Sequence, residues 1–383
     1  MSDHEFDVVI IGGGIVGAAM AYHLAPHRRV VILEAEAAAG YHASGRSAAL
    51  FEPSYGPESI RSLTRASEAF FRSPPEGFAD SPLIHPRGAL FVGRQEQVPA
   101  VEAFYQQQSL ESDTVRCLNT DEALALVPVL AREAAVKAVY DTGAFDIEVD
   151  LLLQGFLKQA KSNGAVFVRN ARVNNIQSCA PGWRVTTEEG LIVRGTVLVN
   201  AAGAWVDQIA QLAGVSAVGI EPRRRSAFIF EAPANIDCSQ WPMTIGIEEN
   251  WYFKPDAGAL LGSPANADPV EPHDVVAEEL DIATAIYFIE QNTKLRIRRP
   301  RHTWAGLRSF VADGEPVCGF DQGHTDFFWA AALGGYGIQS APAFGRLCAC
   351  LILGKGVPED IQAQGLDLRK VSPQRSGLRW TPS

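Results

Sequence analysis

A glycine-rich turn between two apolar runs constrains the fold of this chain more than any other feature of its sequence. Residues 12–17 read GGGIVG and follow an apolar run at 8–11, and a second apolar run at 30–33 ends beside Glu34. This order is typical of a strand, a helix and a parallel strand. The pattern therefore predicts buried strands at 8–11 and 30–33 with a helix at 15–24 between them.

Each position of this turn has a physical task if the unit binds a dinucleotide. Gly12 permits the sharp turn, Gly14 lets the backbone approach a pyrophosphate, and Gly17 lets the helix pack against the strand. The helix N-terminus presents unpaired N–H groups and the positive end of its dipole to the phosphates. Glu34 follows Gly14 by 20 residues, where it can accept hydrogen bonds from both ribose hydroxyls. An acid at this position would repel a 2′-phosphate, which disfavours NADP.

The charge and the cysteines narrow the class of protein. The chain has 383 residues and a net charge of −11, which argues against nucleic acid as the principal partner because nucleic-acid binding needs basic side chains. Its six cysteines are scattered without a CxxC motif, and its eight histidines show no metal-ligand spacing, so we expect no metal site. We expect reduced thiols in a cytoplasmic protein, no secretory signal, and no integral membrane segment, since no run approaches the roughly 18 apolar residues of a span.

The middle of the chain is patterned differently from its ends. The expected helices are 40–49, 120 to about 128, 149–162, 277–291 and 338–353; the expected strands are 89–93, 166–168, 183–187, 191–193, 196–199, 227–231, 243–247, 251–254 and 327–332. Residues 227–254 cluster like an antiparallel sheet. We therefore expect a discontinuous dinucleotide domain joined to a second domain. The expected dinucleotide domain comprises 1–85, 146–222 and 306–383, and the second domain comprises 86–145 and 223–305.

A second glycine turn lies near the other end of the chain. Residues 334–337 read GGYG, after the apolar run at 327–332 and before the helix expected at 338–353. A helix N-terminus at this point can stabilise the negative charge that a reduced flavin carries on its N1–C2=O edge. Such a turn also occurs for packing alone. Together with the first turn, it favours FAD over NAD.

Arginines and tyrosines are the candidates for binding a carboxylate. The arginines are the run Arg223, Arg224 and Arg225, and Arg308. A guanidinium can hold a carboxylate through two parallel hydrogen bonds. Tyr55, Tyr252 and Tyr336 can each add a hydroxyl donor, although an arginine run more often belongs to a solvated face and a single tyrosine to the core or the surface. No Ser/His/Asp set is evident, so we expect the cofactor to supply the chemistry.

Several linked motifs resemble those of the D-amino-acid oxidase superfamily of FAD enzymes over nearly the whole chain. They are the two glycine turns, Glu34, Gly45-Arg46-Ser47, the run VLVNAAGAW at 197–205, and DGEP at 313–316. The pattern is most similar to the bacterial FAD-dependent D-arginine (D-amino-acid) dehydrogenases. The resemblance implies a doubly wound, Rossmann-like α/β FAD domain and an α+β substrate domain on a mixed or antiparallel sheet, with the flavin at their interface.

At the cofactor, the resemblance assigns the ribose to Glu34, the flavin and diphosphate to Arg46 and Ser47, and the adenine to the backbone of Val173. The full set that it implies is Gly12, Gly14, Ile15, Val16, Gly17, Glu34, Ala35, Arg46, Ser47, Ala48, Val173, Ala201, Gly203, Trp205, Gly334, Gly335, Tyr336, Gly337, Ile338 and Gln339. Sarcosine-oxidase relatives link the flavin through a cysteine, but residues 309–313 contain none. We therefore expect non-covalent FAD.

At the substrate, the resemblance assigns the carboxylate to Arg308 and Tyr252 and the amino group to the carbonyl of Gly335. The residues that it implies along the rest of the pocket are Tyr55, Arg225 and Gln339. These assignments imply oxidative deamination of a D-amino acid, in which the α-hydrogen leaves as hydride to flavin N5 and the imino acid hydrolyses to a 2-oxo acid and ammonia.

The chain departs from the arginine-preferring pattern at two positions. Those relatives carry a histidine where Leu50 stands and, where Ala89 stands, a glutamate that pairs with the cationic end of the substrate. The loss of a desolvated charge partner should cost a basic substrate about 2 kcal/mol or more. Glu52 is close enough in sequence to compensate, but an exposed loop acid is an equally good interpretation.

Two further functions stay open at this stage. One is an amine oxidase acting on glycine, sarcosine or another N-substituted amino acid, and the other is a flavin-binding subunit without its own turnover. The residues also leave the electron acceptor open between oxygen, a quinone and other acceptors.

Overall fold

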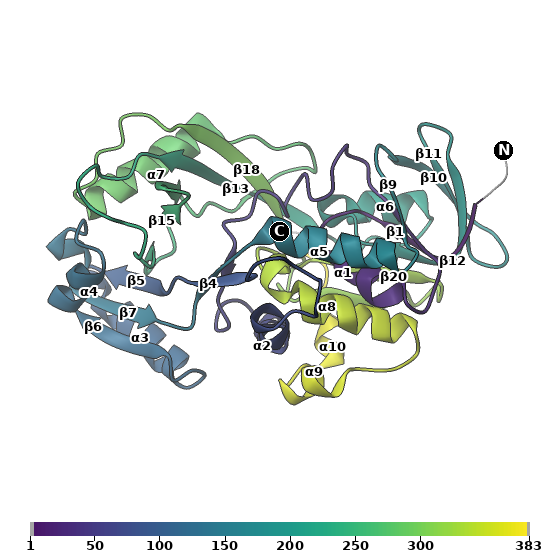
Figure 1. The fold of residues 1–383 in the computed structure, drawn as a ribbon, viewed down its shortest axis with the longest axis horizontal. Helices are drawn as coiled ribbons and strands as arrows, with labels where there is room; N and C mark the ends of the chain where they lie inside the picture. Colours follow the sequence, from purple (N-terminus) through teal and green to yellow (C-terminus); the bar gives the residue numbers. More distant parts are fainter. Residues whose placement is uncertain (1–3, 381–383) are drawn as a thin grey trace.

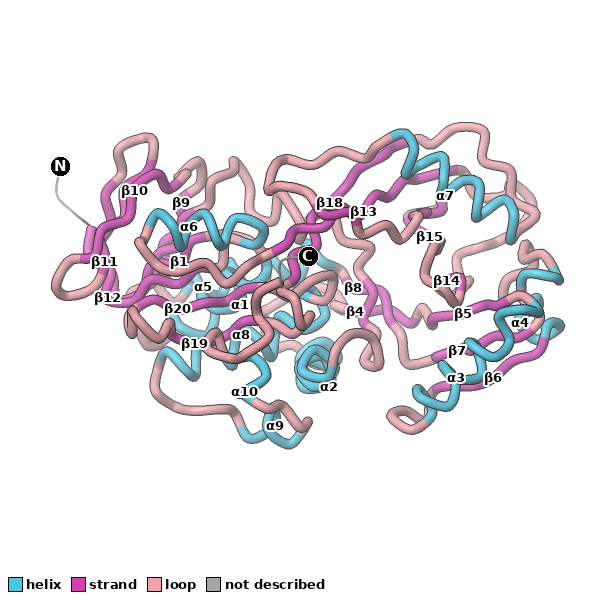
Figure 2. Tube along the Cα trace, turned by 180° about the vertical axis from the view of Figure 1, so that it is seen from behind, coloured by secondary structure: helices cyan, strands magenta, loops and turns pink. Residues whose placement is uncertain are grey.

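Two regions built on different sheets lie side by side in the computed structural model, which describes residues 4–380 (Figure 1). Within these residues there is an eight-stranded sheet, called the first sheet below, a nine-stranded second sheet, and a small three-stranded sheet. The small sheet is formed by β3 (Leu50–Phe51), β8 (Phe145–Ile147) and β4 (Ile84–Pro86). Figure 2 shows the same arrangement from behind.

The first sheet has a parallel centre. Its main path runs β10 (Val173–Ser178), β11 (Trp183–Thr187), β12 (Ile192–Asn200), β1 (His4–Ile11), β2 (Val30–Leu33) and β9 (Val166–Val168), with β20 (Phe327–Ala331) parallel to β12 and β19 (Val317–Phe320) beside β20. Alternate residues of β1 enter two separate apolar cores. Both faces of this sheet are therefore buried, which is why its strands read as continuous apolar runs.

Helices cover both faces of the first sheet. The helices α1 (Ile15–Leu24), α5 (Val149–Ser162) and α8 (Gly337–Ile352) share one core with one face, and α6 (Val206–Leu212) packs on the other. Farther out lie α2 (Glu58–Arg72), which packs on α8, and the short α9 (Glu359–Ala363) and α10 (Leu368–Val371). The predicted strand–helix–strand unit at 8–33 is confirmed, and so is the helix at 149–162.

The second sheet is mostly antiparallel. Its main path runs β17 (Asp268–Pro269), β13 (Glu221–Phe230), β16 (Ala259–Ser263), β15 (Tyr252–Asp256), β14 (Met243–Gly246), β5 (Ala89–Gly93), β7 (Lys137–Asp141) and β6 (Val115–Asn119), and β18 (His302–Phe310) pairs with β13. The helices α7 (Glu279–Asn292) and α4 (Thr120–Leu126) pack on one face, and α3 (Val98–Ser109) packs on the other. The rest of that second face contributes to a cavity described below.

Two sequence predictions differ from the structure. Residues 40–46 form turns rather than a helix, because the two glycines of this polar stretch allow the Gly45 amide to bond to the Gly40 carbonyl at 2.7 Å. The strands expected at 191–193 and 196–199 form one strand, β12. The block at 227–254 is antiparallel where its own strands pair, β14 with β15, and the sheet is mixed because β14 also pairs in parallel with β5. The sequence pattern of β14 cannot distinguish a parallel from an antiparallel neighbour, since both pairings bury the same residues.

The domain boundaries expected at 222 and 305 fall within long strands. The strands β13 and β18 cross these positions and stay paired from Glu221 opposite Phe310 to Ile229 opposite His302. This pair runs from the second sheet toward the first in Figure 1. The boundaries themselves stay a prediction.

Candidate functional site

Two adjoining cavities lie where the first and second sheets meet. The glycine cavity is lined by the turn before α1, the end of β2 and residues 201–205. The arginine cavity is lined by residues 46–52, one face of the second sheet and the start of α8. The residues that line both are Ile15, Ala43, Ser44, Leu307, Gly334 and Gly337. The cavities therefore share a wall, and one elongated ligand can reach both.

The first glycine turn is as tight as the sequence predicts. Gly12 has a φ of +111°, and a Cβ there would lie 2.4 Å from the carbonyl oxygen of Ala201. A Cβ on Gly17 would lie 2.0 Å from the carbonyl oxygen of Gly12. Both positions thus require glycine, Gly12 for its conformation and for space, Gly17 for space alone.

Ser44, which the sequence did not indicate, bonds to the backbone at the start of α1. The Ser44 hydroxyl accepts a hydrogen bond from the backbone N–H of Ile15 at 3.0 Å. It comes from the turn at 40–46, and it satisfies one of the free N–H groups of the helix N-terminus. Its position 29 residues from Ile15 leaves no local sequence signal for this contact.

Glu34 is placed at the end of β2 by two backbone donors. Its carboxylate accepts from the Gly13 N–H at 2.7 Å and from the Glu36 N–H at 2.8 Å. Burial raises the pKa of Glu34, and the two backbone hydrogen bonds oppose that rise. The two bonds go to different carboxylate oxygens of Glu34, so each oxygen keeps a free lone pair for a hydroxyl donor in the glycine cavity.

Most of the predicted cofactor residues line these cavities. Those in the glycine cavity are Gly12, Gly14, Ile15, Val16, Glu34, Ala35, Val173, Ala201, Gly203, Trp205, Gly334 and Gly337. Those in the arginine cavity include Arg46, Ser47, Ala48, Gly335, Ile338 and Gln339. Gly17 and Tyr336 line neither cavity. Gly17 packs α1 on β1, and the Tyr336 ring packs against Tyr55 at 5.2 Å between ring centroids.

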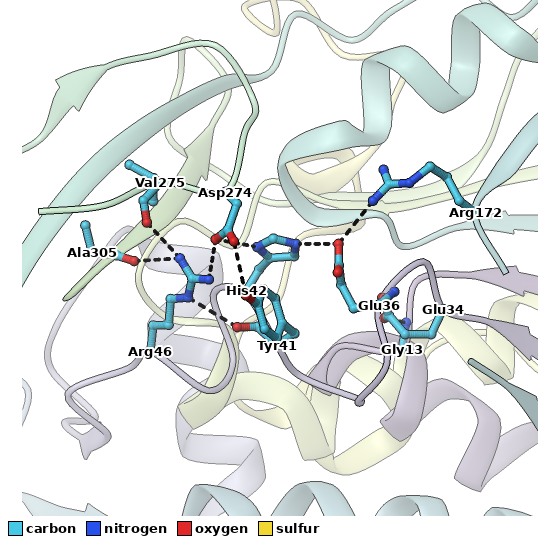
Figure 3. A network of polar contacts seen from close by, with 10 residues as sticks. All are labelled: Gly13, Glu34, Glu36, Tyr41, His42, Arg46, Arg172, Asp274, Val275 and Ala305. Atoms are coloured by element: carbon cyan, nitrogen blue, oxygen red, sulfur yellow. Dashed lines mark hydrogen bonds and ion pairs between the residues drawn. The ribbon is translucent and has the colours of Figure 1, made fainter. Parts of the chain in front are cut away.

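The Arg46 guanidinium is bound by the protein itself. It donates to the carbonyl oxygens of Val275 and Ala305 at 2.9 and 3.0 Å and to the carboxylate of Asp274 at 2.5 Å (Figure 3). Val275 and Asp274 lie in the loop after β17, so this contact ties the second region to the first; we call it the Arg46 tie. Any contact of Arg46 with a cofactor would come from the rest of the residue.

A series of polar contacts continues from the Arg46 tie to residues that line the glycine cavity. His42 lies between Asp274 and Glu36, with its ring nitrogens 3.9 and 3.2 Å from their carboxylates, and Arg172 pairs with Glu36 at 3.2 Å (Figure 3). The sequence analysis did not single out His42 or Arg172, because single polar residues in loops carry no periodic signal.

Arg225 and Arg308 face the arginine cavity from adjacent strands. On β13 and β18, Arg225 is opposite Gly306 and Arg308 is opposite Arg223. Since side chains alternate along a strand, Arg224 points to the other face, where it pairs with Asp281 at 2.9 Å. The run of three arginines therefore contributes one cavity cation, Arg225, and two arginines that are paired with acids of the protein, Arg224 and Arg223, the latter with Glu221 at 2.7 Å.

Neither cavity guanidinium has a carboxylate partner. Arg225 donates to the carbonyl oxygen of Asn266 at 2.6 Å, and Arg308 interacts with Tyr55; along residues 4–380 neither lies within ion-pair distance of an acid. Burial, with the charge of Arg308, lowers the pKa of Arg225. Burial would also lower the pKa of Arg308, but Tyr55 and Tyr336 outweigh it and raise that pKa. The arrangement is that of a site for an anion.

Aromatic and glycine residues shape this anion site. The Tyr55 hydroxyl donates to Glu249 at 3.0 Å, and the Arg308 guanidinium lies 5.5 Å from the centre of the Tyr336 ring. A Cβ on Gly335 would lie 1.7 Å from a nitrogen of Arg308. Gly335 is therefore required for Arg308 to lie flat against the turn before α8.

Gln339 presents a buried amide to the same wall. Its oxygen accepts from the Glu52 N–H at 3.0 Å, and its nitrogen has no hydrogen-bond partner. An unpartnered donor in the first turn of α8 fits a ligand with an acceptor group at the helix start. Neither cavity is lined by a cysteine, and the described residues 4–380 hold no cluster of side chains suited to a metal ion. No helix in that range is long and apolar enough to cross a bilayer.

Known proteins match the chain along nearly its whole length. The family model described as FAD dependent oxidoreductase matches residues 7–351. The glycine oxidase of Geobacillus kaustophilus is 25% identical over 372 residues, which cover 94% of this chain and 96% of that protein. A crystal structure of glycine oxidase from that species aligns with a TM-score of 0.84 at 23% identity, over 97% of this chain and 99% of that one. The mouse protein named FAD-dependent oxidoreductase domain-containing protein 1 is 25% identical over 407 residues, which cover 91% of this chain and 81% of that protein.

These likenesses support the broad superfamily resemblance and the α/β fold predicted from the sequence. The narrower likeness to D-arginine dehydrogenases stays a prediction.

Proposed function

The chain belongs to the family of FAD-dependent oxidoreductases, and from this premise we propose that it oxidises the carbon–nitrogen bond of an amino acid whose carboxylate binds in the arginine cavity. FAD, when bound, supplies the acceptor for the hydride that leaves the substrate. The residues described above then have to hold the cofactor, orient the substrate and keep water out.

The residues of the glycine cavity fit FAD. A Cβ on Gly12 would collide with Ala201, which keeps the turn tight, and Gly14 lines the cavity without a side chain, so a diphosphate can approach the backbone there. Glu34 keeps lone pairs for the ribose, and the unpartnered amide of Gln339 at the start of α8 suits the acceptor edge of a flavin. No cysteine lines either cavity, which supports the prediction that FAD is held without a covalent link.

The pair of guanidinium groups without a carboxylate is the observation that carries the proposal. Arg225 and Arg308 line one cavity, and the acids that line it with them are Glu52 and Glu249. Two buried cations that repel each other are stabilised when an anion binds between them. A substrate carboxylate fits this requirement, and the hydroxyl of Tyr252, which lines the same cavity, can add a donor.

We further propose that the substrate is a D-amino acid. A carboxylate held by Arg308, with the amino group at the Gly335 carbonyl, leaves one of the two faces of the α-carbon toward the cofactor. The roles of Tyr55, Tyr252, Gly335 and Gln339 rest on the superfamily resemblance and on their common place in the arginine cavity. A cytoplasmic location belongs to the same proposal.

A second candidate is oxidation of glycine or an N-substituted glycine. The likeness to glycine oxidase over 94% of the chain favours it. The two functions differ in what occupies the space beside Leu50 and Phe91 in the arginine cavity, which a substrate side chain would fill and glycine would not.

Anaerobic stopped-flow measurement of flavin bleaching tests both candidates. The FAD-loaded protein is mixed with D-alanine, D-arginine, D-phenylalanine, their L-enantiomers, glycine and sarcosine. Faster bleaching by D-enantiomers supports the proposal, and bleaching by glycine or sarcosine alone supports the second candidate. Absence of bleaching by every compound would leave a flavin-binding subunit as the function. Reoxidation with oxygen and with a quinone then identifies the electron acceptor.

A further inference from the structure

Glu52 is a buried acid that the proposed chemistry does not use. It lines the arginine cavity, is 3% exposed, and one of its carboxyl oxygens has no hydrogen-bond partner. The other oxygen accepts from the Ser54 hydroxyl at 2.6 Å. A buried carboxyl oxygen without a partner is costly in a folded protein. The free oxygen is therefore placed to bind a group that enters the cavity.

A second acid lies behind Glu52. No donor of the protein reaches the free oxygen, but the carboxyl of Asp141, itself an acceptor, lies close enough to share one proton with Glu52. Asp141 is fixed in place by the Thr114 hydroxyl at 2.5 Å and the Gly143 N–H at 2.7 Å. Burial, and then the charge of Asp141, raise the pKa of Glu52 to about 8. At neutral pH Glu52 thus holds a proton, and a cation beside it would displace that proton.

Glu52 lines the same cavity as the two arginines. Tyr55 connects them, because its N–H donates to the Glu52 carbonyl oxygen at 3.2 Å and its side chain interacts with Arg308. Asp141, which lies beside Glu52, is opposite Ala89 on β5, the strand that also carries Phe91 of the cavity wall. A substrate whose carboxylate lies at the arginines can therefore extend its side chain within the same cavity toward Glu52.

The other charged groups around the cavity do not neutralise Glu52. On the remaining walls they are Arg46, which is paired with Asp274, and Arg225, Arg308 and Glu249. None of the three arginines is among the causes of the pKa shift of Glu52. Leu50 and Phe91, which line the same cavity, give it an apolar wall. A cation that enters beside this wall would find Glu52 as its counter-charge.

We propose that Glu52 binds the cationic end group, an ammonium or a guanidinium, of the substrate side chain, and that its proton passes to solvent as the cation binds. This inference rests on the proposed function for the placement of the substrate carboxylate. It makes Glu52 a specificity-determining residue: with the proton kept, the cavity accepts apolar side chains, and with the proton lost, it accepts basic ones.

A ligand that does not react tests the inference without turnover. The FAD-loaded protein is titrated with δ-aminovalerate and with valerate, and binding is followed by the change in flavin absorbance. The two carboxylates differ only in the terminal ammonium. We expect δ-aminovalerate to bind at least about tenfold more tightly at alkaline pH, and Glu52→Gln to abolish this preference while the affinity for valerate stays within about twofold.

The pH dependence distinguishes binding from a merely structural role. The ligand amine, with a pKa near 10.4, stays charged throughout, so only the proton on Glu52 competes. With a pKa of about 8 for Glu52, the affinity for δ-aminovalerate should fall about thirtyfold from about pH 9 to about pH 6.5, whereas that for valerate should stay constant. Asp141→Asn removes the neighbouring charge and should move the midpoint to lower pH.

The control is Glu315→Gln, which changes a partly buried acid that bonds to Ser59 and lines neither cavity. This variant should keep the wild-type preference. Equal affinity of the wild type for the two ligands, or a preference unchanged in Glu52→Gln, would overturn the inference.

Stopped-flow bleaching by D-lysine and D-leucine then separates this inference from the proposed function. Selective loss of D-lysine bleaching in Glu52→Gln supports both. Bleaching by D-leucine with no selective effect of the variant overturns the inference alone. A Glu52-dependent preference for δ-aminovalerate in a protein that no amino acid bleaches overturns the proposed function alone.

Discussion

The glycine cavity and the arginine cavity share a wall but are built in different ways. The glycine cavity is formed largely by backbone at the ends of buried parallel strands, where Gly12 and Ala201 approach so closely that no Cβ fits. The arginine cavity is formed by side chains from one face of a mostly antiparallel sheet, among them Arg225, Arg308 and Tyr252. The first needs particular conformations, and the second needs particular functional groups.

Under the proposed function, this difference separates cofactor retention from substrate selection. A change in the glycine cavity alters the path of the backbone and should act on the whole of the proposed FAD site. A change in the arginine cavity removes one group and leaves the scaffold in place, since the strands are held by their own ladder. The following predictions test this separation, beginning with the largest expected effect.

Gly12→Val should abolish FAD binding. Valine disfavours a φ of +111°, and its Cβ would lie 2.4 Å from the Ala201 carbonyl oxygen. The purified variant should be colourless after dialysis against FAD, as measured by flavin absorbance. Gly323→Val is the control, because a Cβ there meets nothing closer than 3.5 Å. A yellow Gly12→Val protein would contradict the backbone account of this cavity.

Arg308→Met should lower kcat/KM by about 100-fold or more, equivalent to roughly 3 kcal/mol, with FAD retained. The loss follows from the removal of one of two cations for the substrate carboxylate. Arg224→Met is the matched control: this neighbour of Arg225 points to the opposite face and pairs with Asp281. The control should unfold more easily, by about 2 kcal/mol, and keep its kcat/KM within about twofold. Unchanged kcat/KM in Arg308→Met would remove that residue from the site.

Acidification should lower kcat/KM for a neutral D-amino acid such as D-leucine while the flavin stays bound. The substrate amine has to be neutral when hydride leaves, so kcat/KM should fall about tenfold per pH unit below the pKa of the amine. Arg308 should not contribute to this limb, because its pKa is raised by Tyr55 and Tyr336 despite burial. The measurement is a pH profile of flavin reduction. A flat profile would exclude this chemistry.

Asp274→Asn should have the smallest effect, an acceleration of FAD release by about two- to fivefold. It removes the charged partner from the Arg46 tie but leaves the two carbonyl acceptors. The carboxylate is 55% exposed, so the stability change should stay below about 1 kcal/mol. Asp360→Asn, which removes an equally exposed carboxylate from its ion pair with Arg346, should leave FAD release unchanged. Equal release rates in both variants would show that the tie does not retain the cofactor.

The sequence predicted the glycine cavity well because its signals are local. The turn at 12–17, the helix at 15–24 and the acid at the end of β2 lie within a single strand–helix–strand unit. The same reasoning failed at 40–46, where the turns depend on contacts with distant partners: Gly40 bonds to the Gly13 carbonyl and Ser44 to the Ile15 N–H. A pattern of polar and small residues contains no record of such partners.

In the arginine cavity, the sequence identified the types of residue but not their directions. Alternation along β13 decides that Arg225 faces the cavity and Arg224 does not, and the register with β18 brings Arg308 to the same face. Glu52 was open between a loop acid and a pocket residue until its burial and its contact with Asp141 were known. These facts depend on the pairing of β5 with β7 and on the packing of the loop after β3 against it.

By itself the sequence determined the dinucleotide unit, because glycine positions and apolar periodicity act on the backbone within a few residues, where conformation and burial are local properties. Only the tertiary structure decided which charged side chains share a cavity, because strand register and face set those neighbours across the 83 residues that separate Arg225 from Arg308. Proximity across such a separation is a property of the folded chain, since no local preference encodes it.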